Sequence, residues 1–247
     1  MNDFYDQLTP FYHLIFEDWN GSVERQSAQL KTLIKKHWPE TKSILDVSCG
    51  IGTQAIGLAQ KGYNVTASDL SEKEAERAKQ EAERRNLTLA VSVCDMRQAF
   101  DHHGTGFDLV ISADNSVPHL LNDNDILIAF KQMFACLKPG GGCLITVRDY
   151  DKEERGRNLL KPYGVRVEGN KRFILFQVWD FEGDQYSLAF HLIEENLSTG
   201  KAITHTLHSR YYAISTNRLC ELMTQAGFRD VQRINDAFYQ PVLLGTI

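Results

Sequence analysis

The sequence predicts an α/β protein built on a doubly wound, largely parallel sheet. Residues 44–148 alternate between short apolar segments typical of buried strands and longer segments with helical periodicity. The first strand-like segment leads through a glycine-containing loop into a helix, ILDVSCGIGTQAIG at residues 44–57. Strands that alternate with helices imply right-handed crossovers and a parallel sheet covered on both faces.

The individual elements follow from local signals. Gly62 is placed to end the first helix, and Ser71 with Glu74 three residues later forms a capping box at the start of the second. A third helix runs over residues 124–137 and ends at KPGGG. The expected strands cover residues 43–47, 64–68, 89–93, 107–112 and 143–147.

The pattern changes after residue 150. Three β-rich runs, residues 172–181, 186–196 and 204–214, are separated by the turn-like stretches EGDQ and LSTGKA. A helix over residues 216–226 and two final strands then restore the alternation. The β-rich insertion is expected to lie over the carboxyl ends of the strands, where open α/β sheets bind ligands. It is therefore a candidate lid, and its aromatic residues at 173–181 are expected to form the lid core.

These boundaries suggest three parts. Residues 41–150 and 213–247 form the core domain, residues 151–212 form the antiparallel β lid, and residues 1–40 form an N-terminal helical segment.

Composition excludes several classes of function. The formal net charge is -5, which argues against a broad basic surface for nucleic acid or anionic membranes. The five cysteines form no CxxC pair, the N-terminus lacks a basic leader, and no apolar run reaches the length of a membrane span. We therefore expect a cytoplasmic protein with a small-molecule substrate, no nucleic-acid or membrane partner and no metal site.

The glycine loop alone leaves two cofactors open. Gly50, Gly52 and Ala55 satisfy the form G-x-G-x-x-A of a dinucleotide site, and Asp69 at the end of the second strand could accept hydrogen bonds from ribose hydroxyls. Asp46 precedes the glycines, where it would repel a pyrophosphate but could bind an ammonium group. This favours S-adenosylmethionine (SAM) over a nicotinamide dinucleotide, although Asp46 could also brace the loop and Asp69 could serve only its helix.

The order of motifs resembles the class I SAM-dependent methyltransferases. Asp46 lies near the end of the first expected strand, Asp69 and Asp95 follow the second and third, FDLVISADNS contains the fourth, and LKPGG precedes the fifth. The resemblance covers about residues 44–247 and implies a Rossmann-like seven-stranded methyltransferase sheet with an antiparallel β-rich lid insertion.

Further motifs are similar to those of glycine and glycine/sarcosine N-methyltransferases. They are DNSVPHL at residues 114–120, VRDYD at 147–151, SRYYAIS with LCELMTQAGF at 209–228, and Tyr-x-Pro at 239–241. The resemblance implies SAM-dependent methylation of the amine of a small carboxylate-bearing substrate, with glycine or sarcosine favoured. The alternatives are a methyltransferase for another small metabolite, with an oxygen, carbon or sulfur acceptor, an NAD-dependent oxidoreductase, and a SAM-binding protein without catalysis.

The resemblance also assigns site residues. The expected cofactor-binding residues are Tyr12, Trp19, Arg25, Asp46, Ser48, Gly50, Gly52, Asp69, Leu70, Asp95, Met96, Asn115 and His119. The expected catalytic residues are Asn115, His119, Arg148 and Tyr212, and the expected substrate-binding residues are Tyr5, Asn115, Arg148, Tyr212 and Tyr239. The N-terminal segment is expected to close over SAM, and the family often assembles through this segment into a homo-oligomer.

Three of these assignments have alternatives. Arg148 is expected to pair with a substrate carboxylate in a bidentate manner, but an ion pair with Asp149 or Asp151 would also explain it. His119 could be a base, a ligand-binding group or a hydrogen-bonded loop residue. Only one of two adjacent tyrosines on a strand faces a given side, and the resemblance favours Tyr212.

Overall fold

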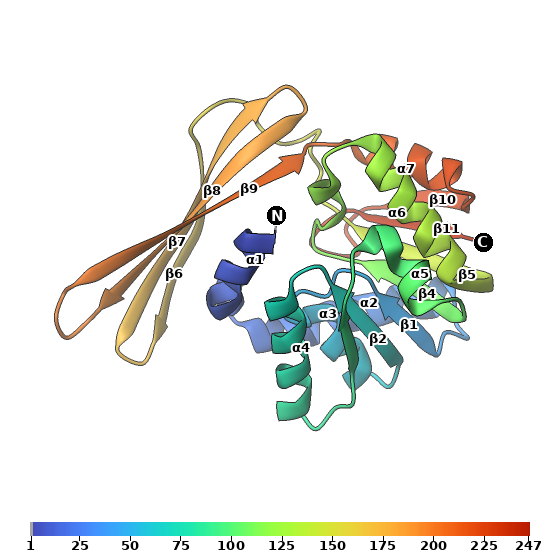
Figure 1. Ribbon diagram of the computed structural model, residues 1–247, viewed down its shortest axis with the longest axis horizontal. Coiled ribbons are helices and arrows are strands. Elements are labelled where there is room, and N and C mark those ends of the chain that lie inside the picture. Colours follow the sequence, from blue (N-terminus) through green and yellow to red (C-terminus); the bar gives the residue numbers. More distant parts are fainter. Residues whose placement is uncertain (1) are drawn as a thin grey trace.

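The computed structural model describes residues 2–247 and contains a seven-stranded sheet with helices on both faces (Figure 1). Its strand order is β10-β11-β5-β4-β1-β2-β3, with β11 antiparallel to its neighbours and the central strands parallel. The strands are β1 (Ser43–Asp46), β2 (Asn64–Asp69), β3 (Ala90–Val93), β4 (Phe107–Ser112), β5 (Leu137–Thr146), β10 (Arg229–Ile234) and β11 (Val242–Thr246). This confirms the predicted doubly wound sheet.

Two hydrophobic clusters cover the two faces of this sheet. Leu30, Ile34 and Ile56 belong to the cluster formed with α2, α3 and α4, whereas Phe130 and Met223 belong to the cluster formed with α6 and α7. The helices are α1 (Asn2–Leu8), α2 (Trp19–His37), α3 (Thr53–Gln60), α4 (Glu72–Arg84), α5 (Ala99–His103), α6 (Asp123–Cys136) and α7 (Thr216–Gln225), with 3-10 turns η1 (Thr9–Ile15), η2 (Met96–Gln98) and η3 (Val117–Leu120). No helix within residues 2–247 is both long and apolar enough to cross a membrane.

The predicted capping box is present at the start of α4. The backbone N–H of Glu74 donates a hydrogen bond to the Ser71 hydroxyl, with the two heavy atoms 3.2 Å apart. A cap of this kind satisfies one of the backbone donors that every helix leaves free in its first turn. It fixes the entry of the chain into α4 directly after the end of β2.

The insertion is a separate antiparallel sheet of four strands in the order β6-β7-β8-β9. The strands are β6 (Leu159–Glu168), β7 (Lys171–Glu182), β8 (Gln185–Asn196) and β9 (Ala202–Tyr212). Three of them match the predicted runs, but β6 was not predicted. Pro162 and Gly164 break its alternation, and the pairing with β7 shifts register between them, as at a β-bulge.

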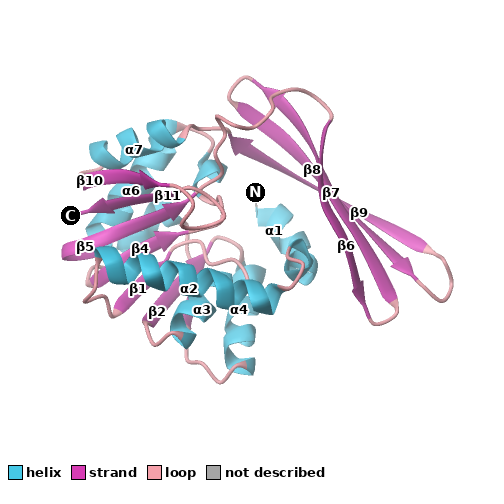
Figure 2. Cartoon of the chain, turned by 180° about the vertical axis from the view of Figure 1, so that it is seen from behind, coloured by secondary structure: helices cyan, strands magenta, loops and turns pink. Residues whose placement is uncertain are grey.

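The N-terminal segment lies between the two sheets (Figures 1 and 2). Its apolar residues Phe4, Leu8 and Leu14 are buried in the same cluster as residues of β7, β8 and β9. Polar contacts join it to α4 and to β6: the Ser71 hydroxyl donates to Asp6, the Thr9 hydroxyl donates to Glu74, and His13 lies 3.0 Å from Glu168. The segment therefore connects the core to the insertion.

The strand β5 begins earlier than predicted, because KPGGG is part of it instead of a turn before it. A Cβ atom on Gly142 would lie only 2.0 Å from the indole ring of Trp38. The glycine thus allows β5 to pass directly over the buried ring of Trp38, the residue at which α2 ends.

Candidate active site

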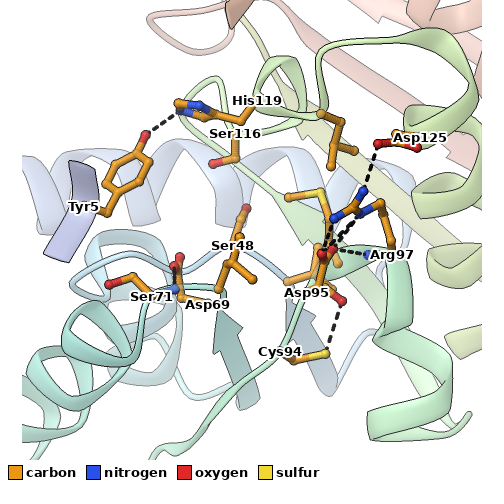
Figure 3. Close-up of a pocket in the computed structure, with 14 residues that line it drawn as sticks. Tyr5, Ser48, Asp69, Ser71, Cys94, Asp95, Arg97, Ser116, His119 and Asp125 are labelled. Carbon is orange, nitrogen blue, oxygen red and sulfur yellow. Dashed lines mark hydrogen bonds and ion pairs between the residues drawn. The ribbon is translucent and has the colours of Figure 1, made fainter. Parts of the chain in front are cut away.

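A first cavity lies at the carboxyl ends of β1, β2, β3 and β4 (Figure 3). This position is the switch point of the sheet, because the chain runs outward from β1 in one direction to β3 and then continues in the other direction from β4. The lining residues come from α1, from the chain at and after the ends of β1, β2, β3 and β4, and from α6: Tyr5, Val47, Ser48, Asp69, Leu70, Ser71, Cys94, Asp95, Met96, Arg97, Ser116, His119, Leu120 and Asp125.

The glycine loop is tied to β2 through Asp69. The backbone N–H of Gly50 donates to one carboxylate oxygen of Asp69 (2.8 Å), and that of Ser71 donates to the other (2.9 Å). Gly52 has a positive φ of 93°, and a Cβ atom there would lie 2.8 Å from Ile56. Glycine is required at this position because both the backbone conformation and the close packing exclude a side chain.

Buried carboxylates surround this loop. One oxygen of Asp46 accepts from the Ser48 N–H at 3.2 Å, and one oxygen of Glu74 accepts from Thr9. The second oxygen of each carboxylate has no partner among the residues with described side chains. Burial raises the pKa of Asp46 to about 7 and that of Glu74 to about 8. Carboxylates removed from water without a cationic partner are costly, so a positively charged ligand at the loop would suit them.

The far end of the first cavity is formed by β3 and the turn that follows it. Asp95 forms an ion pair with Arg97 (2.6 Å), and Arg97 also pairs with Asp125 (2.8 Å). Burial by itself would raise the pKa of Asp95, but the hydrogen bonds from Arg97 hold this pKa below its usual range. Its carboxylate is therefore ionised and fixed in orientation beside Met96.

A second cavity adjoins the first and shares Tyr5 with it. It lies between the N-terminal segment, the ends of β4 and β5, and the inner face of the four-stranded sheet. Its lining is largely aromatic with a few polar groups: Phe4, Tyr5, Leu8, Tyr12, Ile15, Asp114, Asn115, Arg148, Tyr163, Gln177, Trp179, Tyr186, Leu188, Tyr211 and Gln240.

Arg148 is the only cation among these lining residues. Its guanidinium lies 4.8 Å from the centre of the Trp179 ring, and one Nη donates to Glu153 at 3.1 Å. Its Nε is buried and has no partner among the residues with described side chains. The ion pair of Arg148 is thus with Glu153, not with Asp149 or Asp151, and it leaves the Nε–H unused.

Asn115 uses both ends of its amide within the protein. Its side-chain N–H donates to the Tyr150 hydroxyl (2.8 Å), and its oxygen accepts from the backbone N–H of Arg148 (3.0 Å). These bonds fix the backbone that carries Arg148. Asn115 lines the second cavity, but its hydrogen bonds give it a positioning role in this arrangement.

His119 lies at the junction of the two cavities. Its Nε2 is 2.6 Å from the Tyr5 hydroxyl, and its ring centre is 3.9 Å from that of Tyr211. Burial lowers the pKa of His119 to about 3, so the imidazole is neutral at physiological pH.

The choice of Tyr212 over Tyr211 does not agree with the structure. Tyr211 lines the second cavity and stacks on Tyr186, whereas the Tyr212 hydroxyl donates to Asp123 at 2.9 Å, away from the cavity. Adjacent residues of a strand point to opposite faces, and the sequence alone did not indicate which face is the inner one.

Several other expected residues do not line the first cavity. Asp46, Gly50 and Gly52 belong to the glycine loop and the strand before it but are not among the lining residues of this cavity. Trp19 and Arg25 both lie in α2, where the Trp19 indole N–H donates to Thr53 and Arg25 donates to Ser22.

The remaining two tyrosines lie on the side of the second cavity. Tyr12 lines that cavity, and its ring would lie 3.8 Å from a Cβ atom on Gly50. Tyr239 lines an open groove that shares Arg148 and Gln240 with the second cavity.

Lining residues that the sequence did not indicate include Asp114, Tyr163, Trp179 and Tyr186. Asp114 could have been found, because it begins the motif DNSVPHL and directly precedes Asn115. Trp179 was expected only in the core of the lid; it is buried there and also forms the wall behind Arg148.

Comparison with known proteins agrees with this architecture. Residues 44–141 match the family described as methyltransferase domain. A glycine/sarcosine N-methyltransferase from Parasynechococcus marenigrum (strain WH8102) is 33% identical over 145 residues, which are 58% of this chain and 50% of that protein. The matched region thus spans about half the length of this curated relative.

Solved structures resemble nearly the whole chain. The crystal structure of Streptomyces venezuelae DesVI has a TM-score of 0.80 at 20% identity and covers 98% of this chain and 96% of its own. SAM-bound CalS10, an amino pentose methyltransferase from Micromonospora echinaspora, has a TM-score of 0.79 at 16% identity, with 91% of each chain covered. Residues 44–141 thus match a methyltransferase domain, and nearly the whole chain has the fold of these solved structures, an amino pentose methyltransferase among them.

Proposed function

We propose that the protein transfers a methyl group to the amine of a small substrate that carries a carboxylate, with glycine or sarcosine as the favoured acceptors. The observation that carries this proposal is the buried guanidinium of Arg148, with an unpartnered Nε, in an aromatic cavity next to the first cavity. The methyltransferase family and the glycine/sarcosine N-methyltransferase relative support the reaction class.

In this proposal the first cavity holds the cofactor. Asp69 would accept hydrogen bonds from the ribose hydroxyls, Leu70 and Met96 would contact the adenine, and Asp95 would meet its amino group. When bound, SAM supplies an electrophilic methyl group on a positively charged sulfur. The buried carboxylates of Asp46 and Glu74 near the loop fit such a cationic ligand.

The second cavity would hold the acceptor. Arg148 would pair with the substrate carboxylate, and charge-assisted N–H bonds would fix its direction. Asn115 holds the backbone of Arg148 in place. Binding both reactants in adjoining cavities supplies proximity and orientation, which are worth up to about 7–11 kcal/mol of a barrier in favourable cases.

The N-terminal segment and the insertion would cover these cavities. Tyr5 and Tyr12 come from the first segment, and Tyr163, Trp179, Tyr186 and Tyr211 come from the insertion. We propose that residues 1–40 close over the cofactor and residues 151–212 over the substrate. Their aromatic rings would exclude water and could attract the positive sulfur through cation–π contact.

The test is an acceptor panel with methyl-labelled SAM and the purified protein. Glycine, sarcosine and dimethylglycine carry both amine and carboxylate, ethylamine lacks the carboxylate, glycolate lacks the amine, and an amino sugar and a catechol represent other acceptor classes. We expect label transfer to glycine or sarcosine and none to ethylamine or glycolate. Transfer only to the amino sugar or the catechol would refute the proposed acceptor but not the methyltransferase.

A binding titration tests the cofactor separately. SAM and NADH are added to the protein while its tryptophan fluorescence is recorded. The proposal requires SAM to change the fluorescence. A response to NADH alone would overturn it and favour an oxidoreductase.

A further inference from the structure

Asp114 places a buried carboxylate in the second cavity, directly after β4. Both Asp114 and Asn115 have a positive φ, 59° and 66°, which L-residues adopt at a cost and Asp and Asn tolerate best. The backbone N–H groups of the two residues donate to the hydroxyl and carbonyl oxygens of Thr146, at 2.8 and 3.0 Å. This unusual backbone turns the Asp114 side chain into the cavity.

The carboxylate is held in place by neutral groups. The Gln240 amide donates to its Oδ1 at 3.3 Å, while the Gln240 oxygen accepts from the Thr146 hydroxyl at 3.1 Å. The ionisable neighbours of Asp114 are Tyr12, Tyr163 and Tyr239, which carry no positive charge, and Arg148.

Asp114 has no ion-pair partner within 4.0 Å among the residues with described side chains, since Arg148 pairs with Glu153 instead. Burial raises the pKa of Asp114 above its usual value. A carboxylate kept in a cavity without a counter-charge costs folding free energy. Such a group is expected where a ligand supplies the missing positive charge.

We propose that Asp114 binds the nitrogen of the methyl acceptor, so that Arg148 and Asp114 together select a zwitterionic α-amino or N-methylamino acid. This inference rests on the proposed function and narrows its substrate class. Arg148 receives the carboxylate at one side of the cavity and Asp114 accepts an N–H bond from the amine. Acceptors that lack either charge, such as hydroxy acids and simple amines, lose one of the two contacts.

SAM, when bound, would supply a second cation near this site, so Asp114 could serve either the cofactor in the first cavity or the acceptor in the second. Asp114 lines the second cavity and is absent from the lining of the first. If Asp114 served the cofactor, its replacement would weaken SAM binding. If it serves the acceptor, SAM binding stays the same and the acceptor parameters change.

The experiment uses Asp114→Asn, which keeps the shape of the side chain and tolerates the positive φ. Asp230→Asn is the matched control, because Asp230 also has a positive φ (52°) but is exposed on β10. For sarcosine we expect kcat/KM to fall by about 10- to 100-fold in Asp114→Asn, the effect of losing a hydrogen bond to a charged group. The Kd for SAM, measured by calorimetry, and the control variant are expected to match the wild type.

Glycolate serves as a second readout, because it carries the carboxylate and lacks the amine. Its inhibition constant against sarcosine is expected to be unchanged in Asp114→Asn and raised in Arg148→Lys. This pattern would separate the two ends of the acceptor within one folded protein. Thermal unfolding of each variant verifies that the fold is intact.

Two results would overturn the inference. An unchanged kcat/KM for sarcosine in Asp114→Asn would remove Asp114 from the acceptor site, and a rise in the SAM Kd that accounts for the loss would assign it to the cofactor. A wild-type protein that methylates no amino acid would instead refute the proposed function, and this inference with it.

Discussion

The hydroxyl of Tyr5 and Nε2 of His119 lie 2.6 Å apart and join α1 to the chain after β4 (Figure 3). This bond closes the wall between the two cavities, because Tyr5 lines both of them and His119 lines the first. Its strength depends on the imidazole being neutral, so that one ring nitrogen can accept from the phenol. The low pKa of His119, about 3, which results from burial, provides this state.

His119 is therefore expected to stay neutral in the folded protein across pH 5–8. A side-chain ¹⁵N NMR titration should show no protonation of His119 in this range, whereas a titration near the usual value of 6.5 would contradict its burial. Since the pKa in the folded state is lower than in the unfolded state, the stability from this group is present above pH 6.5 and is lost as the pH falls toward 3.

The Tyr5→Phe variant tests the same bond by stability. It leaves the Nε2 of a buried histidine without its partner, which costs about 1–3 kcal/mol. Urea unfolding at pH 7 measures the loss, and Tyr63→Phe is the control, because the buried Tyr63 hydroxyl has no partner among the residues with described side chains. Equal stability of Tyr5→Phe and the wild type would show that the bond contributes nothing.

Arg148→Lys is expected to raise the KM of the acceptor by about tenfold or more and to leave the KM of SAM unchanged. A lysine keeps the charge but loses the planar N–H groups, including the unpartnered Nε. Steady-state kinetics with each reactant varied in turn measures both values. Arg155→Lys is the control, because Arg155 is exposed and pairs with Asp184 outside both cavities. Equal rises in both KM values would remove Arg148 from acceptor binding.

The sequence predicted the sheet and the first cavity better than the second cavity. Asp69, Leu70, Asp95 and Met96 lie at or within three residues of the carboxyl ends of β2 and β3, so their position at one edge of the sheet depends only on the strand order. The capping signals at Ser71 and Gly62 predicted helix boundaries, because such signals depend only on residues within one turn of the chain.

The second cavity depends on how distant segments pack. Tyr211 and Tyr212 differ only in which face of β9 is inner, and that is decided by the contact of Tyr211 with Tyr5 from α1 and with Tyr186 from β8. Arg148 forms its ion pair with Glu153 and not with Asp149, because Asp149 pairs with Arg233 from β10. These choices depend on contacts between different elements or on competing partners, and periodicity carries no information about them.

Glu74→Gln is expected to flatten the dependence of stability on pH. The pKa of Glu74 is raised to about 8 by burial, well above its value in an unfolded chain, so its contribution is present below about pH 4.5 and is lost as the pH rises through 8. One such group gives a slope of up to about 1.4 kcal/mol per pH unit. Asp46, with a pKa of about 7, adds a second contribution in the same direction.

Urea unfolding without SAM at pH 5, 6, 7 and 8 measures this effect. The wild type should lose stability over this range, Glu74→Gln should lose less, and the double variant with Asp46→Asn least of all. Glu76→Gln, on the exposed face of the same helix, should follow the wild type. A Glu74→Gln curve parallel to that of the wild type would show that Glu74 is ionised in the folded protein.

Gly142→Ala is expected to destabilise the protein by about 1–3 kcal/mol or more, the usual cost of forcing extra volume into a packed core. The new methyl group would lie 2.0 Å from the buried Trp38 ring, and neither the indole nor β5 can move without disturbing the strands β4 and β11 on either side of β5. Gly156→Ala is the control, since a methyl group there makes only ordinary contact with Leu159, at 3.4 Å. Differential scanning calorimetry should therefore show a lower Tm for Gly142→Ala alone. Equal Tm values would mean that the ring shifts freely, and the glycine in KPGGG would then need another explanation than its contact with Trp38.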